Sequence, residues 1–360
     1  MRALLVAGAR PNFVKVAPLY RALREQGSEV FLVHTGQHYD PALSDIFFRE
    51  LDIPAPDVHL GVGSGTHAGQ TARIMEAFEP VVERIEPDVV VVVGDVNSTL
   101  ACALVTAKLP PRLAHVEAGL RSGDWSMPEE VNRVVTDRVS DVLLAPSRDA
   151  VQNLLAEGCD PERVHLVGNV MVDSLLSRLD AARARRAAER FGLTPGGYVF
   201  ATLHRPATVD DPEVLARVLD AFGRIADACP VLLAAHPRTA KRLGEIPVPR
   251  GVKVVDPVGY LDSIGLQDSA ALVLTDSGGI QEETTVLGVP CLTLRENTER
   301  PVTVTHGTNR LVGTDPEVIE TVALETLARS DGRRPSQIEG WDGRAAERCV
   351  SAIFRRVSSA

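Results

Sequence analysis

The sequence predicts an α/β protein of two doubly wound domains, each a parallel sheet with helices on both faces. The chain has 360 residues, and at about 150 residues per domain this length favours two domains. Short Val, Leu and Ile runs alternate with longer amphipathic segments from end to end. Most of the short runs lack alternating polar residues, which is typical of strands that are buried on both faces.

We expect six strands in each half of the chain. They are residues 3–7, 30–34, 89–93, 113–116, 142–145 and 164–167, then 198–203, 231–235, 252–255, 271–275, 290–294 and 310–312. Helices are expected at 14–26, 70–85, 98–108, 148–156, 212–228 and 280–287, and at the end of the chain at 343–357. A charged helical stretch at 180–190 separates the halves, so the domain boundary falls within 169–196. We therefore expect a first domain at 1–172 and a second at 173–343.

Composition and charge exclude several classes of protein. Apolar residues make up 44% of the chain and the net charge is −10, which describes a globular protein and argues against a general nucleic-acid binder. Apolar runs as short as Val89–Val93 cannot span a membrane, and the N-terminus reads as a first strand rather than a secretory signal. An odd number of cysteines without a C-x-x-C pair favours reduced thiols and a cytoplasmic location. These are Cys102, Cys159, Cys229, Cys291 and Cys349.

Several cofactor and catalytic motifs are absent from the sequence. It contains no P-loop, no G-x-S-x-G elbow and no H-E-x-x-H, and its histidines lack metal-ligand spacing. Residues 63–68 formally match the loose dinucleotide pattern, but no solid strand precedes them and no acidic partner follows. We interpret them as a flexible loop and expect neither a bound metal nor another cofactor.

Carboxylates follow two expected strands of the first half. Asp95 comes after the strand at 89–93, and Glu117 comes after the strand at 113–116. Ligands of parallel sheets bind beyond the carboxyl ends of the strands, so both side chains should point into one crevice. Further on, Glu129 lies in an acidic first helical turn. The simpler alternatives are a helix N-cap for Asp95 and interaction with the helix dipole for Glu129.

Glycine turns with basic neighbours suggest anion sites at two strand ends. The turn at 8–12 contains Arg10 and leads into a helix that carries Lys15, although an ordinary strand-to-helix turn is the simpler interpretation. The stretch LTDSGGIQEE at 274–283 is stronger, because two glycines at a helix start let the backbone approach a phosphate closely. His204 and His236 also follow strands, where a packed core histidine is the alternative.

In this order the motifs resemble those of the non-hydrolysing UDP-N-acetylglucosamine 2-epimerase family. The matching stretches are GARPNFVKVAPL, TGQHYD, VVGDVNSTLA, HVEAGLRSGD, PEEVNR, VGNVMVDSL, TLHRP, HPRT, LTDSGGIQEE, RENTERP and GTNRLVGTD, from residue 8 to 315. The resemblance implies the glycosyltransferase-B architecture: two Rossmann-like domains with a UDP-sugar in the interdomain cleft. It also implies that a last helix at about 344–360 packs back on the first domain, and that the chain forms a homodimer.

The resemblance further implies roles for individual residues. The family's catalytic acids match Asp95, Glu117 and Glu129, and its catalytic-site histidine matches His204. Its UDP contacts match Arg10, Lys15, Ser277, Gly278, Gly279, Glu283 and Arg300. In some relatives a second UDP-sugar acts as an activator, through residues that match Gln37, His38, Gln70, Arg205 and His236. Which acid removes the C2 proton stays open.

The expected activity is reversible inversion at C2 of UDP-N-acetylglucosamine. Because C2–H is barely acidic, an epimerase must either oxidise the sugar or expel the group at C1. No NAD fingerprint supports oxidation, and the family mechanism eliminates UDP to give 2-acetamidoglucal and then adds it back. The alternatives are an epimerase of a UDP-2,3-diacetamido sugar, a glycosyltransferase of the same architecture, and a UDP-sugar sensor without turnover. The expected partner is therefore the UDP-sugar, with no nucleic acid and no membrane.

Overall fold

The computed structural model describes residues 1–37, 48–329, 335 and 337–358, which form two compact units. Unit 1 comprises Met1–Ser177 and Glu339–Ala360, and unit 2 comprises Arg178–Ile338. The sequence placed the corresponding divisions after residues 172 and 343. None of the helices in the part of the chain described here has the length and apolar character needed to cross a membrane.

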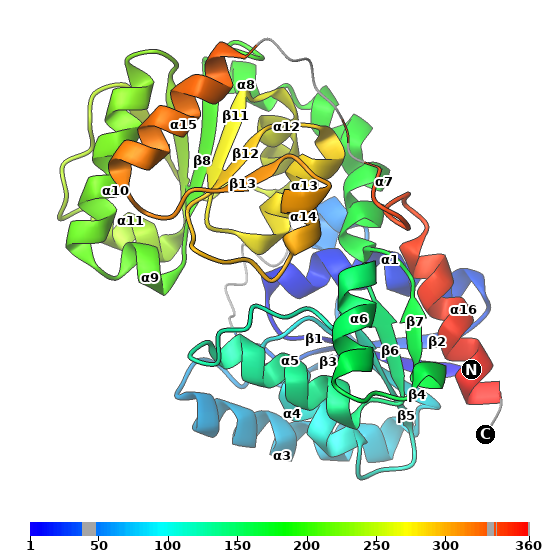
Figure 1. Cartoon of the computed structure of the whole chain (residues 1–360). Helices are drawn as coiled ribbons and strands as arrows, with labels where there is room; N and C mark the ends of the chain where they lie inside the picture. Colours follow the sequence, from blue (N-terminus) through cyan, green and yellow to red (C-terminus); the bar gives the residue numbers. More distant parts are fainter. Residues whose placement is uncertain (38–47, 330–334, 336, 359–360) are drawn as a thin grey trace. The chain divides into compact units, whose positions relative to one another are not determined.

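Unit 1 contains a seven-stranded sheet in the order β3-β2-β1-β4-β5-β6-β7 (Figure 1), with all neighbouring strands parallel. The strands are β1 (Arg2–Ala7), β2 (Glu29–His34), β3 (Val58–His59), β4 (Val89–Val93), β5 (Arg112–Val116), β6 (Val142–Ala145) and β7 (Val164–Leu166). The helices are α1 (Arg10–Glu25), α3 (His67–Ile85), α4 (Asn97–Thr106), α5 (Pro128–Val139), α6 (Arg148–Ala156), α7 (Val170–Ala184) and α16 (Ala345–Ser358), with a 3-10 turn at Pro161–Arg163.

Unit 2 contains a six-stranded parallel sheet in the order β10-β9-β8-β11-β12-β13. Its strands are β8 (Val199–Leu203), β9 (Val231–Ala235), β10 (Val252–Val255), β11 (Leu272–Thr275), β12 (Cys291–Thr293) and β13 (Asn309–Leu311). Its helices are α8 (Ala187–Arg190), α9 (Pro206–Val209), α10 (Pro212–Ala226), α11 (Pro237–Leu243), α12 (Tyr260–Ser269), α13 (Gly278–Leu287), α14 (Pro301–Thr305) and α15 (Pro316–Ala328).

The predicted fold class is confirmed: both sheets are parallel and doubly wound. All twelve expected strands are present, and the added strand β3 has only two residues, too few for a periodic signal. In unit 1 the strand order reverses beside β1 and β4, and in unit 2 beside β8 and β11. Such reversals open a crevice beyond the carboxyl ends of the strands, which is where ligands of doubly wound sheets bind.

The apolar strands are buried because helices cover them. All residues of Val89–Val93 are at most 1% exposed, and α3 and α4 pack against β1 and β4 through Ile74, Phe78 and Cys102. The interpretation of residues 63–68 as a loop is wrong at its end. Thr66 accepts a hydrogen bond from the Gly69 N–H and so starts α3, which places His67 in the helix.

The charged stretch at 180–190 is not one continuous helix. Helix α7 ends at Ala184, and α8 begins at Ala187. The break lies at Arg186, whose φ of 49° is left-handed and incompatible with a continuing right-handed helix.

Helix α16 packs on α1 and on strands β5 and β6 of unit 1. The Asp173 carboxylate of α7 accepts hydrogen bonds from the backbone N–H groups of Ala345 (3.1 Å) and Ala346 (2.7 Å), at the N-terminus of α16. The chain leading into α16 also runs against Gly168, whose φ is 86°, and a Cβ at Gly168 would lie 2.0 Å from the Gly340 carbonyl oxygen. Glycine is therefore required at position 168 both by the left-handed φ and by the close approach of the Gly340 carbonyl.

We expect Gly168→Ala to lower the free energy of unfolding by about 3 kcal/mol or more, because it adds a backbone clash to the cost of a left-handed alanine. Gly158→Ala is the matched control: its φ is 79°, but nothing lies within 4 Å of the added Cβ. Gly158→Ala should lower the free energy of unfolding by about 1 kcal/mol. Urea unfolding of both variants tests this, and equal losses would show that the contact with Gly340 contributes nothing.

Candidate functional site

Two acids of unit 1 lie at the same edge of the sheet. Asp95 follows β4 and Glu117 follows β5, and these strands pair in parallel from Val89↔Arg112 to Val93↔Val116. The turn at Gly94 is close to the second acid, because a Cβ there would stand 3.2 Å from Glu117 Oε2 and 3.0 Å from Lys15 Nζ. The sheet therefore brings Asp95, Glu117 and Lys15 into one neighbourhood, as the strand-end pattern predicts for the two acids.

Helix α5 holds Asp95 through both its side chain and its backbone. Arg133 donates to Asp95 Oδ2 from Nε (3.0 Å) and Nη2 (2.6 Å), and the Asn132 amide donates to the Asp95 carbonyl oxygen (2.8 Å). The N-cap of α4 is Val96, without a side-chain capping bond. Asp95 is thus not the helix cap that the simpler alternative proposed.

Glu117 is buried and conformationally strained. It is 5% exposed and has a φ of 74°, a left-handed conformation that few non-glycine residues adopt. Its Oε2 forms an ion pair with Lys15, which is also buried. Strained residues of this kind cluster at functional sites, where the surrounding structure over-determines them. Lys15, predicted as a UDP contact, is thus the direct partner of a predicted catalytic acid.

The two acids at the start of α5 have different surroundings. Glu130 is buried, and its carboxylate accepts hydrogen bonds from the N–H groups of Ser122 and Gly123 and from Arg133 Nη1 (2.6 Å). It therefore fixes the preceding loop. Glu129 is half-buried and makes no hydrogen bond or ion pair to the residues that the structure describes. Of the two, Glu129 has its carboxylate available to a ligand.

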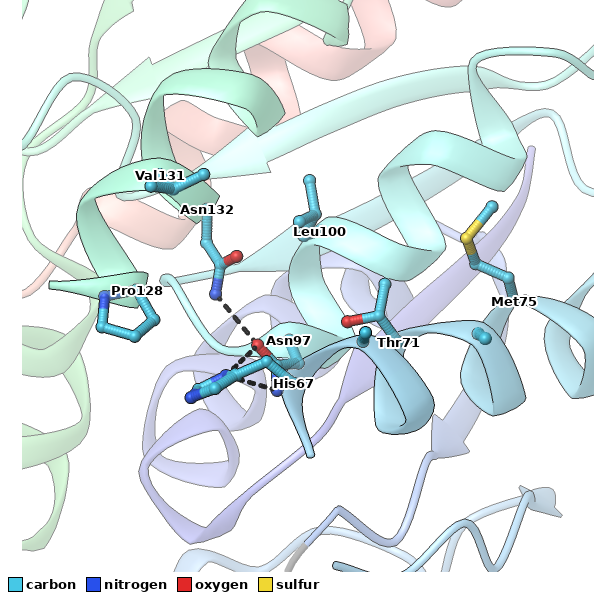
Figure 2. Close-up of a pocket in the computed structure, with 10 residues that line it drawn as sticks. His67, Thr71, Met75, Asn97, Leu100, Pro128, Val131 and Asn132 are labelled. Carbon is cyan, nitrogen blue, oxygen red and sulfur yellow. Dashed lines mark hydrogen bonds between the residues drawn. The ribbon is translucent and has the colours of Figure 1, made fainter. Parts of the chain in front are cut away.

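A groove of about 550 Å³ lies between α3, α4 and α5, beside this cluster (Figure 2). Its walls are mainly apolar. The lining residues are His67, Ala68, Thr71, Ala72, Met75, Asn97, Leu100, Pro128, Val131 and Asn132. Its polar members are connected, because Asn97 contacts His67 Nδ1 and also accepts from the Asn132 amide (3.4 Å). Asn132 therefore links the groove to the Asp95 loop.

In unit 2, His204 and Asp276 meet at the carboxyl edge of β8 and β11. His204 Nδ1 lies 2.7 Å from Asp276 Oδ1, and Asp276 is fully buried. Asp276 Oδ2 also accepts from the N–H groups of His204 (2.9 Å) and Arg205 (2.8 Å). The His204 side chain remains 39% exposed. It is therefore an oriented surface histidine rather than the packed core histidine of the simpler alternative.

Arginines and acids surround the start of α13. Glu299 pairs with Arg205 (3.2 Å), Arg295 (2.8 Å) and Arg300 (2.6 Å), and Arg300 also pairs with Glu282 (2.9 Å). The group counts three guanidinium groups and two carboxylates, so it is positive where the free N–H groups of a helix start point. A helix N-terminus flanked by arginines favours phosphate groups.

Two glycines begin α13 next to this positive group. A Cβ on Gly278 would lie 2.5 Å from Arg300 Nη1, so a side chain at this position would displace the guanidinium group of Arg300. Ser277 is the N-cap, and its side chain makes no capping bond. Gly279 continues the first turn. The predicted UDP contacts Ser277, Gly278, Gly279 and Arg300 are therefore neighbours.

Glu283 lies one turn further along α13 and is buried. Burial raises the pKa of its carboxyl to about 7, although the hydrogen bond from the Gln267 amide (2.7 Å) acts in the opposite direction. Its carboxyl also interacts with Tyr260, and burial raises the pKa of that phenol. Glu283 is thus held in place by two side chains of α12.

The residues predicted for an activator site belong to both units. Gln37 and Gln70 are neighbours in unit 1, with the Gln70 amide 3.4 Å from the Gln37 carbonyl oxygen. Arg205 and His236 belong to unit 2, where His236 accepts from the Arg238 N–H at the start of α11. His38 lies outside the described residues, and so does the side chain of Arg10. No cluster of His, Cys, Asp or Glu among the described residues fits a metal ion.

Comparison with known proteins gives a family. A sequence profile described as UDP-N-acetylglucosamine 2-epimerase matches residues 21–354. The chain belongs to the UDP-N-acetylglucosamine 2-epimerase family. It is therefore an epimerase, as the sequence motifs predict.

Two characterised relatives differ in substrate. The UDP-N-acetylglucosamine 2-epimerase of Methanocaldococcus jannaschii is 41% identical over 98% of this chain and 99% of its own length. The UDP-2,3-diacetamido-2,3-dideoxy-D-glucuronate 2-epimerase of Pseudomonas aeruginosa is 44% identical over 92% of this chain and 93% of its own. The crystal structure of the M. jannaschii enzyme with UDP-GlcNAc and UDP superimposes with a TM-score of 0.92 at 40% identity, covering 99% of this chain and 100% of that one.

The residues that hold the predicted ones in this epimerase were not identified from the sequence. Arg133, Asn132, Asp276 and Glu299 make the contacts that orient Asp95, His204 and the arginines. Asn132 and Arg133 lie inside the quoted stretch PEEVNR, so the motif was the available signal, and their near-complete burial is known only from the structure. Asp276 and Glu299 lie inside quoted motifs, but only the three-dimensional contacts give them their partners.

The raised pKa of Glu283 makes the stability of the epimerase depend on pH. The folded protein keeps this proton up to about pH 7, whereas the unfolded chain loses it near 4.5. Stability contributed by the protonated carboxyl is therefore lost as the pH rises through 7. Between about pH 5 and about pH 8 the wild type should lose about 3 kcal/mol more than Glu283→Gln, measured by urea unfolding.

The control for this experiment is Glu245→Gln, an exposed acid of unit 2. It should follow the wild-type pH dependence. If wild type and Glu283→Gln change in parallel, the carboxyl of Glu283 titrates in the folded protein as it does in the unfolded chain.

Proposed function

We propose that this chain interconverts UDP-N-acetylglucosamine and UDP-N-acetylmannosamine, by elimination of UDP to 2-acetamidoglucal and re-addition. The reaction needs a base at C2, an environment that tolerates positive charge at C1, and a firm hold on UDP between the two steps. Carboxylates serve the first two needs, as they do in glycoside chemistry. A set of phosphate-binding groups serves the third.

The observation that carries the proposal is the acid cluster of unit 1. Asp95 and Glu117 follow neighbouring strands, and each is paired with a buried cation, Arg133 or Lys15. Such pairing keeps a carboxylate charged in a buried place, which suits both proton abstraction and stabilisation of an oxocarbenium-like centre. Glu129, without a partner among the described residues, completes the proposed set of three acids.

The proposal assigns the positive group of unit 2 to UDP. The start of α13 with Ser277, Gly278 and Gly279 suits the diphosphate, together with Arg300. Glu283 suits the ribose hydroxyls, because a carboxyl held by Gln267 can accept from both. His204, oriented by Asp276 and half-exposed, is assigned to the reacting sugar and its leaving group. Gln37, His38, Gln70, Arg205 and His236 are assigned to a second, activating UDP-sugar.

A second candidate substrate is a UDP-2,3-diacetamido-2,3-dideoxyglucuronate. It is favoured by the 44% identity to the Pseudomonas aeruginosa relative, which exceeds the 41% identity to the Methanocaldococcus jannaschii relative. The chemistry at C2 is the same for both substrates. They differ in the amide at C3 and in the carboxylate at C6, so specificity depends on side chains around the hexose rather than on the acids.

Incubation with each UDP-sugar alone in D2O tests the proposed function. An epimerase places deuterium at C2 of the manno product without any acceptor, because the proton removed is exchanged before re-addition. A glycosyltransferase leaves C2 unlabelled and needs an acceptor, and a sensor changes nothing. The ratio of kcat/KM for the two UDP-sugars decides between the two candidate substrates.

Glu117→Gln should lower kcat by about 100-fold or more, because a neutral amide can neither remove the C2 proton nor stabilise developing positive charge. The Kd for UDP should stay within about threefold, since the group acts on the sugar. Glu25→Gln, an exposed acid of the same unit, is the matched control. Near-normal turnover of Glu117→Gln would contradict the assigned role.

We further propose a homodimer that uses the groove between α3, α4 and α5. Val131, at 39% exposure, stands at its wall beside Pro128, Leu100 and Met75. Exposed apolar patches of this kind mark interaction surfaces, and a second copy of the chain is the partner that the family resemblance implies.

We also propose a cytoplasmic location for the enzyme, with which its five free cysteines agree.

Val131→Lys should convert the dimer to a monomer, because it buries a charge in the apolar contact. Light scattering of the purified variant measures the mass. Val318→Lys, at 42% exposure on α15 of unit 2, is the matched control and should stay dimeric. A wild type of monomer mass, or a dimeric Val131→Lys, would refute this interface.

A further inference from the structure

His115 is a buried residue whose two ring nitrogens both meet oxygen atoms. It lies in β5, one residue before the end of the strand, and its side chain is fully buried. Its Nδ1 is 2.6 Å from Asp137 Oδ1, and its Nε2 is 2.8 Å from the Gly94 carbonyl oxygen. A carbonyl oxygen can only accept a hydrogen bond, so Nε2 carries a hydrogen.

The other partner, Asp137, is a carboxylate. Burial alone raises the pKa of its carboxyl, but His115 and Arg121 together hold it below the ordinary value. Its second oxygen accepts from the Gly119 N–H (3.0 Å) and lies 2.8 Å from Arg121 Nη2. Because the Gly119 N–H and Arg121 already stabilise the ionised carboxylate, we assign the hydrogen between Asp137 and His115 to the ring. The ring then donates from both nitrogens, which is the imidazolium form.

The charged groups around this pair form a continuous line of ion pairs. Arg121 is also held by Glu157, from Nε to Oε1 at 2.7 Å. The line thus runs from the ring of His115 through Asp137 and Arg121 to Glu157, with alternating charges. A buried imidazolium next to a buried carboxylate satisfies the charge of each, which isolated burial would not allow.

This pair holds the two loops that carry the proposed acids. Gly94 immediately precedes Asp95, and its carbonyl is bound by the ring of His115. Gly119 follows Glu117 by two residues, and its N–H is bound by Asp137. Both glycines have left-handed φ angles, 70° and 83°. Their conformations are therefore fixed by side-chain contacts from one ion pair.

We propose that His115, paired with Asp137, is a positioning residue of the epimerase: a buried ring that donates from both nitrogens and fixes the Asp95 and Glu117 loops relative to each other. The inference rests on the proposed roles of these two acids. His115 itself does not exchange a proton with the substrate, because both of its N–H groups are occupied within the protein.

Nitrogen NMR of histidine-labelled wild type tests the protonation state. The signal assigned to His115, by its loss in His115→Gln, should show hydrogen on both nitrogens at about pH 7. A ring with only one protonated nitrogen overturns the proposal. This readout does not depend on which substrate is turned over.

Kinetics test the positioning role. His115→Gln keeps one amide donor for the Gly94 carbonyl but loses the charge, and it should lower kcat by about 10- to 100-fold, since small misplacements of reacting groups have costs of this size. His115→Phe should lower kcat further. In both variants the Kd for UDP should stay within about threefold of wild type. The matched control is His165→Gln, which changes a histidine of the edge strand β7 in the same sheet and should leave kcat unchanged.

The outcomes separate this inference from the function on which it rests. If Glu117→Gln turns over normally, the assignment of the acids fails, whatever His115 does. If Glu117→Gln is inactive and His115→Gln retains full kcat, or loses UDP affinity in proportion to kcat, only the positioning role of His115 fails. Should His115→Gln not fold, Asp137→Asn takes its place: kcat should fall with UDP binding retained, and an unchanged kcat would overturn the proposal.

Discussion

Helix α5 is the element on which the acid site of unit 1 depends. Successive turns of its inner face present Glu130, Arg133 and Asp137, all nearly completely buried. Glu130 and Asp137 receive backbone N–H groups from the loop after β5, and Arg133 holds Asp95 after β4. One helix thus holds two loops through charged side chains. Displacement of α5 would release both acids together, which is why its buried charges matter more than its modest apolar face.

The two units use buried charge in opposite ways. In unit 1 two of the three proposed acids face a buried cation, Glu117 facing Lys15 and Asp95 facing Arg133, so most of the charge of these two carboxylates is balanced locally. In unit 2 arginines outnumber acids around Glu299, so the group keeps positive charge for an anion. Glu283 is an exception, because burial outweighs its hydrogen bonds and raises the pKa of its carboxyl to about 7. Carboxyl groups thus occur in three settings: paired with one cation in unit 1, surrounded by arginines at Glu299, and buried with a raised pKa at Glu283.

The sequence predicted the parts of this molecule that follow from local periodicity. Apolar runs such as Val89–Val93 identify buried strands without further information, and strand ends locate Asp95 and Glu117. Helices with a weak periodic signal were missed. An example is α15 (Pro316–Ala328), whose apolar residues are spread around the helix. The partners of the acids were missed for a different reason. Nothing in the spacing of Asp95 and Arg133 along the chain reveals that they meet, because that contact results from the strand order.

The same arrangement makes the proposed acid site compatible with a doubly charged nucleotide. The chain carries a net charge of −10, and three carboxylates are assigned to one substrate, which by itself would repel a diphosphate. Pairing with Lys15 and Arg133 removes most of that repulsion at short range, where it matters, while screening weakens the distant surface charges. Asp95 and Glu117 each depend on one buried basic side chain, so we regard Arg133 and Lys15 as parts of the proposed site on the same footing as the acids that they hold.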